Sequence, residues 1–229
     1  LVVNRSTEAS LAGAISGSGS LTQWGSATSV LSATNSNLGA TSVASGALYI
    51  DGDQSAATGA TSVAPGAALG GRGTIGGNVA LADGATLAPG GLGPAPGTLT
   101  INGDLSLAGG STLNYSFGQA NVAGGAFNDL TQVAGNLRLD GTLNAVVSPG
   151  RTFDTGVYRV FSYGGALVNQ GLALGAMPAG DGFLVTSVAN HVNLVATSGE
   201  PLNFWDGAAG PKNNVVANGG DGVWQNING

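Results

Sequence analysis

The chain has 229 residues, of which 42 are Gly and only 8% are charged, whereas an ordinary soluble domain carries about 25% charged residues. Its mean hydropathy is positive, which argues against intrinsic disorder, because disordered chains combine low hydrophobicity with high charge. The net charge is −6 and the basic residues are scattered singly, so nucleic acid and anionic membranes are poor partners; these residues are Arg5, Arg72, Arg138, Arg151, Arg159 and Lys212.

Helical signals are missing along the chain. Gly and Ala are abundant while Glu, Lys and Gln are scarce, and we find no stretch of about 15 residues that has helical periodicity and lacks Gly. No apolar run reaches the roughly 18 residues that a spanning helix needs, and residues 1–5 do not resemble a signal peptide. There is no cysteine, which excludes disulfides and Cys-ligated metals. We expect an all-β fragment of a longer protein.

An internal repeat begins with residues 41–48, returns 20 positions later in residues 61–69, and appears a third time in residues 78–87. Each copy has a short alternating strand, a small residue with Gly at a corner, and a second strand that opens with Leu. The theme continues in residues 97–107, 110–115 and 137–146. A fixed period of about 20 residues is typical of a solenoid, so we predict a right-handed parallel β-helix of about ten coils.

Gly has a specific role at the predicted corners, because tight turns need a positive φ that Gly adopts at low cost. Asn-Gly or Asp-Gly pairs occupy positions 51–52, 83–84, 102–103 and 140–141. Isolated pairs of this kind are also typical of antiparallel hairpins, so an antiparallel sandwich is the alternative fold. The nearly constant spacing favours parallel stacking, with equivalent Leu and Val residues in interior ladders.

Three zones follow from these patterns. Residues 1–118 are the regular β-helix repeats, and residues 119–199 continue the helix with bulkier, aromatic-containing coils. Residues 200–229 contain Trp205 and Trp224 in a Gly- and Asn-rich tract, and they look like the start of a further repeat unit or a linker.

The order of these segments resembles the passenger domain of autotransporters (type V secretion). Residues 12–22, 31–37 and 39–48 are similar to the passenger-associated transport repeat, and residues 73–79, 88–90 and 96–99 are similar to the segment that usually follows it. Further matches lie at 129–135, 158–161, 204–207 and 219–224. The resemblance implies a secreted or surface-exposed protein of a Gram-negative bacterium. Its parent would carry an upstream signal peptide and a C-terminal outer-membrane β-barrel.

We find no convincing catalytic, cofactor-binding or metal site. The acids are spread along the chain, and we expect them to form turns and face solvent; they include Asp51, Asp53, Asp83, Asp104, Asp129, Asp140, Asp154 and Asp181. The close pair Asp51 and Asp53 is the best candidate for Ca²⁺, but it lacks the tandem repeats of calcium-binding β-rolls.

Other chemically suggestive residues also have simple structural interpretations. His191 is the only histidine, and it has no nucleophile-elbow motif beside it, so we expect it in a strand or at a corner. The Gly-rich residues 70–73 are expected to form a coil corner rather than a phosphate loop. Trp24, Trp205 and Trp224 could stack on sugars, but we expect them to pack over strand ends.

These observations favour a structural and adhesive surface module over an enzyme. The expected partners are a host cell surface, extracellular matrix or like chains, with no cofactor, and the expected location is the bacterial cell surface or the extracellular space. The alternative is a polysaccharide-acting β-helix enzyme whose active site lies outside this fragment or is hidden within it, because enzymes of that class use the same architecture.

Overall fold

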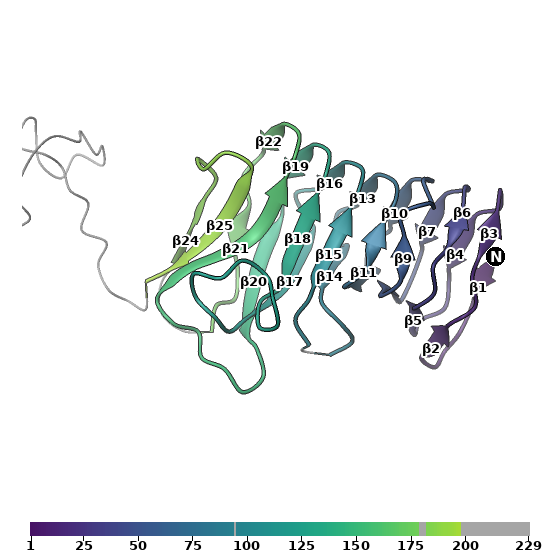
Figure 1. Ribbon diagram of the computed structural model, residues 1–229, viewed down its shortest axis with the longest axis horizontal. Helices are drawn as coiled ribbons and strands as arrows, with labels where there is room; N and C mark the ends of the chain where they lie inside the picture. Colours follow the sequence, from purple (N-terminus) through teal and green to yellow (C-terminus); the bar gives the residue numbers. More distant parts are fainter. Residues whose placement is uncertain (94, 179–181, 198–229) are drawn as a thin grey trace, which may run out of the picture. The chain divides into compact units, whose positions relative to one another are not determined.

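The computed structural model describes residues 1–93, 95–178 and 182–197, and Figure 1 shows them as a stack of short strands. Trp205, Trp224, Asp181 and the predicted zone 200–229 lie outside the described residues. The only regular elements of the described residues are strands. The described residues contain no helix that could cross a membrane.

The first of three long sheets has eight parallel strands. They lie in chain order, and along the chain each pair of neighbours is separated by two strands that belong to other sheets. Its strands are only two or three residues long. They are β1 (Val2–Val3), β4 (Leu21–Gln23), β7 (Thr41–Val43), β10 (Thr61–Val63), β13 (Val79–Leu81), β16 (Leu105–Leu107), β19 (Leu137–Leu139) and β22 (Leu167–Asn169).

The second sheet is also parallel and has eight strands. Most of its strands have three or four residues, and the two longest have six. The members are β2 (Ala9–Leu11), β5 (Thr28–Leu31), β8 (Ala47–Ile50), β11 (Ala68–Gly71), β14 (Thr86–Pro89), β17 (Thr112–Phe117), β20 (Thr142–Val147) and β23 (Ala173–Leu174).

The third sheet is parallel until its last two strands, β25 (His191–Ala196) and β24 (Gly182–Val185), which pair antiparallel. They cover the end of the sheet beside β21 (Gly156–Tyr163), as Figure 1 shows. The parallel part contains β9 (Asp53–Gln54), β12 (Thr74–Ile75), β15 (Thr98–Ile101), β18 (Leu130–Val133) and β21. Two earlier strands, β3 (Ser16–Gly17) and β6 (Ser36–Asn37), pair separately.

The predicted parallel β-helix is therefore confirmed, and the antiparallel sandwich is wrong for the body of the stack. Ser62 pairs in register with Ser42 and with Ala80, as the repeat predicts. The described residues form eight coils rather than about ten, because the coils lengthen along the chain: Ala80 pairs with Ser106 and Ser106 with Arg138. The right-handed sense of the coil stays a prediction.

Ladders of apolar side chains fill the interior. Leu48, Leu69, Leu87, Leu113 and Leu143 pair one above the other in the second sheet, and each is 0% exposed. Each such burial contributes about 1.5–3 kcal/mol. The stack is therefore stabilised coil by coil rather than by one central core.

Gly is needed at the Asp-Gly and Asn-Gly corners for two different reasons. Gly84 and Gly141 have φ values of 76° and 91°, as predicted for corner glycines. Gly52 and Gly103 are not in the positive-φ region, so the predicted cause is wrong there. A Cβ at Gly52 would collide with the backbone of Ala33 in the preceding coil, and one at Gly103 would collide with Asn78.

Coil lengthening is concentrated at one corner, between the second and third sheets. In earlier coils this corner takes only residues 51–52 and 72–73. In three later, consecutive coils it takes residues 90–97, 118–129 and 148–155, which we call the corner loops. Figure 1 shows them projecting from the same edge of the stack.

Aromatic side chains replace aliphatic ones inside the coils that carry the corner loops 118–129 and 148–155. The rings of Tyr115 and Phe161 lie 5.9 Å apart, and those of Phe117 and Tyr158 lie 5.2 Å apart. Phe153 stacks on Tyr158 at 4.7 Å. The wider coil needs these larger rings to fill its interior. The zone boundary at residue 118 stays a prediction.

Candidate binding surface

Each corner loop contacts its neighbour in the stack. The guanidinium of Arg151 lies 3.4 Å from the ring centroid of Phe127, and the hydroxyl of Ser148 donates to the carbonyl oxygen of Phe127 at 2.7 Å. On the other side, the N–H of Gly97 donates to Oδ1 of Asp129 at 2.8 Å. The loops are therefore supported by their neighbours in the stack.

Asn128 holds the loop 118–129 in shape from within. Its side chain is 0% exposed, and its Oδ1 accepts hydrogen bonds from the N–H groups of Gly118 and Gln119 at 2.9 and 3.1 Å. Its Nδ2 donates to the carbonyl oxygens of Gln119 and Val122, both at 2.8 Å. One buried amide thus satisfies four backbone groups of the loop, which would otherwise lack partners.

Asp129 fastens two coils at the base of the same loop. Its Oδ1 accepts from the N–H of Gly97 at 2.8 Å, and its Oδ2 accepts from the N–H of Ser116 at 2.6 Å. The side chain is 2% exposed. Burial raises the pKa of this carboxyl to about 7, although both hydrogen bonds oppose the rise.

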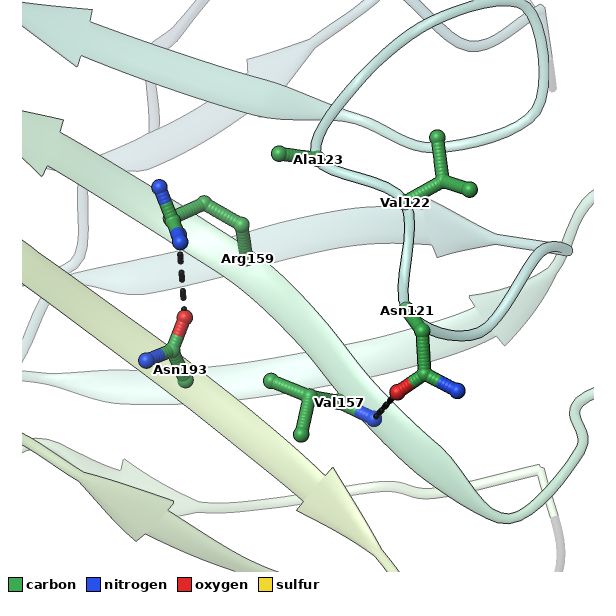
Figure 2. Close-up of a pocket in the computed structure, with 6 residues that line it drawn as sticks. All are labelled: Asn121, Val122, Ala123, Val157, Arg159 and Asn193. Atoms are coloured by element: carbon green, nitrogen blue, oxygen red, sulfur yellow. Dashed lines mark hydrogen bonds between the residues drawn. The ribbon is translucent and has the colours of Figure 1, made fainter.

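A cavity of about 240 Å³ opens between this loop and the outer face of the third sheet, and Figure 2 shows its lining. Strand β21 contributes Val157 and Arg159, and β25 contributes Asn193. The loop contributes the segment 121–123, which is Asn121, Val122 and Ala123. We call this cavity the Arg159 pocket.

Two hydrogen bonds fix the geometry of the Arg159 pocket. The Nε of Arg159 donates to Oδ1 of Asn193 at 3.0 Å, and the N–H of Val157 donates to Oδ1 of Asn121 at 3.1 Å. Asn193 is only 6% exposed. The guanidinium is therefore held on a buried amide through its Nε (Figure 2).

In the part of the chain that the structure describes, Arg159 has no ion-pair partner. Among the described residues, Arg72 and Asp51 form the sole ion pair, so no carboxylate neutralises Arg159. The pKa of nearby His191 is lowered, first by burial and then by the charge of Arg159. The positive charge of Arg159 therefore disfavours protonation of His191.

A second, more open hollow of about 420 Å³ lies between the loops 118–129 and 148–155. Its lining includes Gln119, Arg151, Thr152 and Asp154. Here the cation is already engaged on the ring of Phe127, and Asp154 accepts a hydrogen bond from the Thr152 hydroxyl at 3.0 Å. The polar groups of this hollow are largely paired with each other.

Most of the acids have the predicted corner role. Asp83 accepts from the N–H of Gly110 in the next coil at 2.8 Å, and Asp104 accepts from that of Asn136 at 2.7 Å. Asp140 bonds the N–H of Gly141, and Asp154 is exposed in a loop. The prediction is wrong for Asp129, which is buried because the loop 118–129 closes over it.

Asp51 and Asp53, the candidate pair for Ca²⁺, each bind a different partner within the protein. Asp51 accepts from the N–H of Arg72 at 3.2 Å and forms the ion pair with its guanidinium at 3.9 Å. Asp53 accepts from the N–H of Ser55 at 2.8 Å, which lowers the pKa of its carboxyl. Within the described residues there is no group of three or more His, Cys, Asp or Glu side chains placed to hold a metal.

The remaining candidates fall at strands and corners. His191 begins β25, as predicted for a strand histidine, and pairs with Ser162. Gly70 and Gly71 are the last residues of strand β11, so the predicted coil corner at 70–73 is confirmed only for residues 72–73. Trp24 is 60% exposed at a corner after β4, so the prediction that it packs over strand ends is wrong.

The Arg159 pocket was not found from the sequence. Arg159 stands in the segment Tyr158-Arg159-Val160-Phe161, and a single cation among apolar strand residues was the available signal. Its partners, Asn121 and Asn193, are 38 and 34 positions away along the chain. Their convergence depends on the coil length and on the antiparallel turn before β25.

No family model matches the chain. It is 54% identical over 212 residues to a protein named "Adhesin BmaC autotransporter" from Brucella suis biovar 1 (strain 1330). This alignment covers 92% of the chain but only 6% of that relative. Together with the stacked parallel sheets, the match confirms the resemblance to an autotransporter passenger stated above.

Proposed function

We propose that this chain is a structural and adhesive module, a rigid stack that presents the corner loops to a partner. An autotransporter passenger is exposed on the bacterial surface or secreted, so the partners in reach are a host cell surface, extracellular matrix or like chains. The observation that carries the proposal is the 54% identity to a segment of a protein named an adhesin.

The architecture supports adhesion through its surface. The strands are held by neighbouring coils, and the corner loops gather at one edge, where Val122 and Val157 are 38% and 39% exposed. Loops on a rigid scaffold are the usual site of recognition. Several weak contacts along a repeating stack would add up through multivalency.

Adhesion is proposed rather than catalysis. Asp129 has the perturbed pKa that marks many catalytic acids, but both its oxygens accept backbone hydrogen bonds that fasten two coils. The Arg159 pocket is lined by a cation, amides and apolar groups, with no acid to act as a general base. These features suit binding of a ligand.

The experiment that tests adhesion uses beads coated with the purified chain. Binding is measured to host cells, to wells coated with matrix proteins, and to beads that carry the same chain. We expect binding to at least one of these surfaces above that of beads coated with an unrelated protein. Absence of binding to all three would refute the proposal, and hydrolysis of a polysaccharide panel by the chain would favour the enzyme alternative.

A further inference from the structure

All the polar groups that line the Arg159 pocket present hydrogen-bond donors. A guanidinium has five N–H groups. The Nε–H is used by Asn193 at 3.0 Å, and Nη1 is 3.5 Å from Oγ of Ser162. Both N–H groups of Nη2, and one of Nη1, have no partner among the described residues.

The two amides in the pocket are oriented in the same sense. The Oδ1 of Asn121 accepts from the N–H of Val157, and the Oδ1 of Asn193 accepts from Arg159. Each amide oxygen therefore already accepts one hydrogen bond within the protein, and neither NH₂ group has a partner among the described residues. A site whose side chains offer these free donors, with a positive charge at one end, fits a ligand rich in acceptors and negatively charged.

We propose that the Arg159 pocket binds one carboxylate-bearing sugar ring, a uronic acid unit of a glycan. The carboxylate matches the planar fork of the guanidinium. Ring and hydroxyl oxygens accept from the amides of Asn121 and Asn193, and the C–H face of the ring packs on Val122 and Val157. The cavity of about 240 Å³ is smaller than the roughly 300–1,000 Å³ of pockets for drug-sized ligands, which suits a single ring.

This inference rests on the proposed function, because it names the chemistry that an adhesive surface would recognise. A free surface arginine would not make the same case. Arg159 is half-buried, its Nε is held by a residue that is 6% exposed, and no carboxylate among the described residues pairs with it. Partial burial strengthens its interaction with an anion, since the local dielectric constant is lower than that of water.

The test measures binding of glucuronic acid to the whole chain by ligand-observed NMR titration. The comparison ligands are its methyl ester, glucose, acetate and inorganic phosphate. Arg159→Gln removes the charge and keeps a side chain that donates hydrogen bonds. Arg138→Gln is the matched control, because Arg138 is an exposed cation on the first sheet of the stack. Circular dichroism verifies that each variant is folded.

We expect glucuronic acid to bind the wild-type chain and the Arg138→Gln variant equally. Arg159→Gln should weaken binding by about 10- to 100-fold, the usual effect of losing a charge-assisted contact. The methyl ester and glucose should bind more weakly by a similar factor. Asn121→Gly provides a second variant, since Gly tolerates the positive φ of 63° at this position; it should weaken binding without unfolding the chain.

Three results would overturn the inference. The first is equal binding of glucuronic acid to the wild type and to Arg159→Gln, and the second is equal binding of the acid and its ester. The third is equal binding of acetate or phosphate, which would make the pocket a general anion site. The bead assay separates this failure from that of adhesion: a chain that adheres to cells but does not bind glucuronic acid keeps the proposed function and loses this one.

Discussion

The pKa of Asp129 depends on two opposing effects, because burial raises it and hydrogen bonds lower it. Its carboxyl has a pKa of about 7 in the folded chain, against an ordinary value of 3.8. The folded state therefore holds the proton more tightly than the unfolded state does. By linkage, the stability that this group contributes is complete below about pH 4 and declines as the pH rises to about 7.

The size of this decline follows from the two pKa values. Each pKa unit corresponds to about 1.36 kcal/mol, so ionisation of Asp129 should lower the free energy of unfolding by about 4 kcal/mol between pH 4 and pH 8. Asp129→Asn cannot ionise and so loses this pH dependence. Its NH₂ group cannot accept the second N–H, which costs about 1–3 kcal/mol.

The wild type should therefore be more stable than Asp129→Asn at about pH 4, and less stable at about pH 8. Urea denaturation followed by circular dichroism measures both proteins across this range. The control is Asp83→Asn, where an exposed carboxylate also accepts a backbone N–H from the next coil but lacks the burial that drives the effect. A difference between wild type and Asp129→Asn that stays constant with pH would refute the reasoning.

Three other substitutions test the packing and the loops. Leu87→Ala should lower the free energy of unfolding by about 2–5 kcal/mol in urea denaturation, while Thr86→Ala on the outer face should change it by less than about 1 kcal/mol; equal effects would argue against the interior ladder. Gly52→Ala should reduce the melting temperature because its Cβ meets the preceding coil, whereas Gly13→Ala enters open space and should not. Asn128→Ala should make the loop 118–129 sensitive to limited proteolysis, with cleavage confined to that loop, because four backbone hydrogen bonds lose their partner; unchanged resistance would contradict its role.

The sequence by itself determined the repeating architecture. Residues 41–43 and 61–63 have the same side chains and pair in register. Side chains alternate between the two faces of a strand, so its Leu or Val face is buried only when the strand pairs in register with an equivalent strand. Corner glycines such as Gly84 could be predicted too, since a positive φ is a local property of the chain. The same repeats identified the protein family.

The tertiary structure alone decided the number of coils, the burial of Asp129 and the Arg159 pocket. Insertions at a corner leave the strand pattern intact, so the sequence does not reveal that three of them project side by side. Asn121, Arg159 and Asn193 converge only because the loop 118–129 folds back over β21 and because β25 returns antiparallel beside it. Local periodicity predicts which face of a strand is buried, whereas a site built from distant segments depends on how whole coils are stacked.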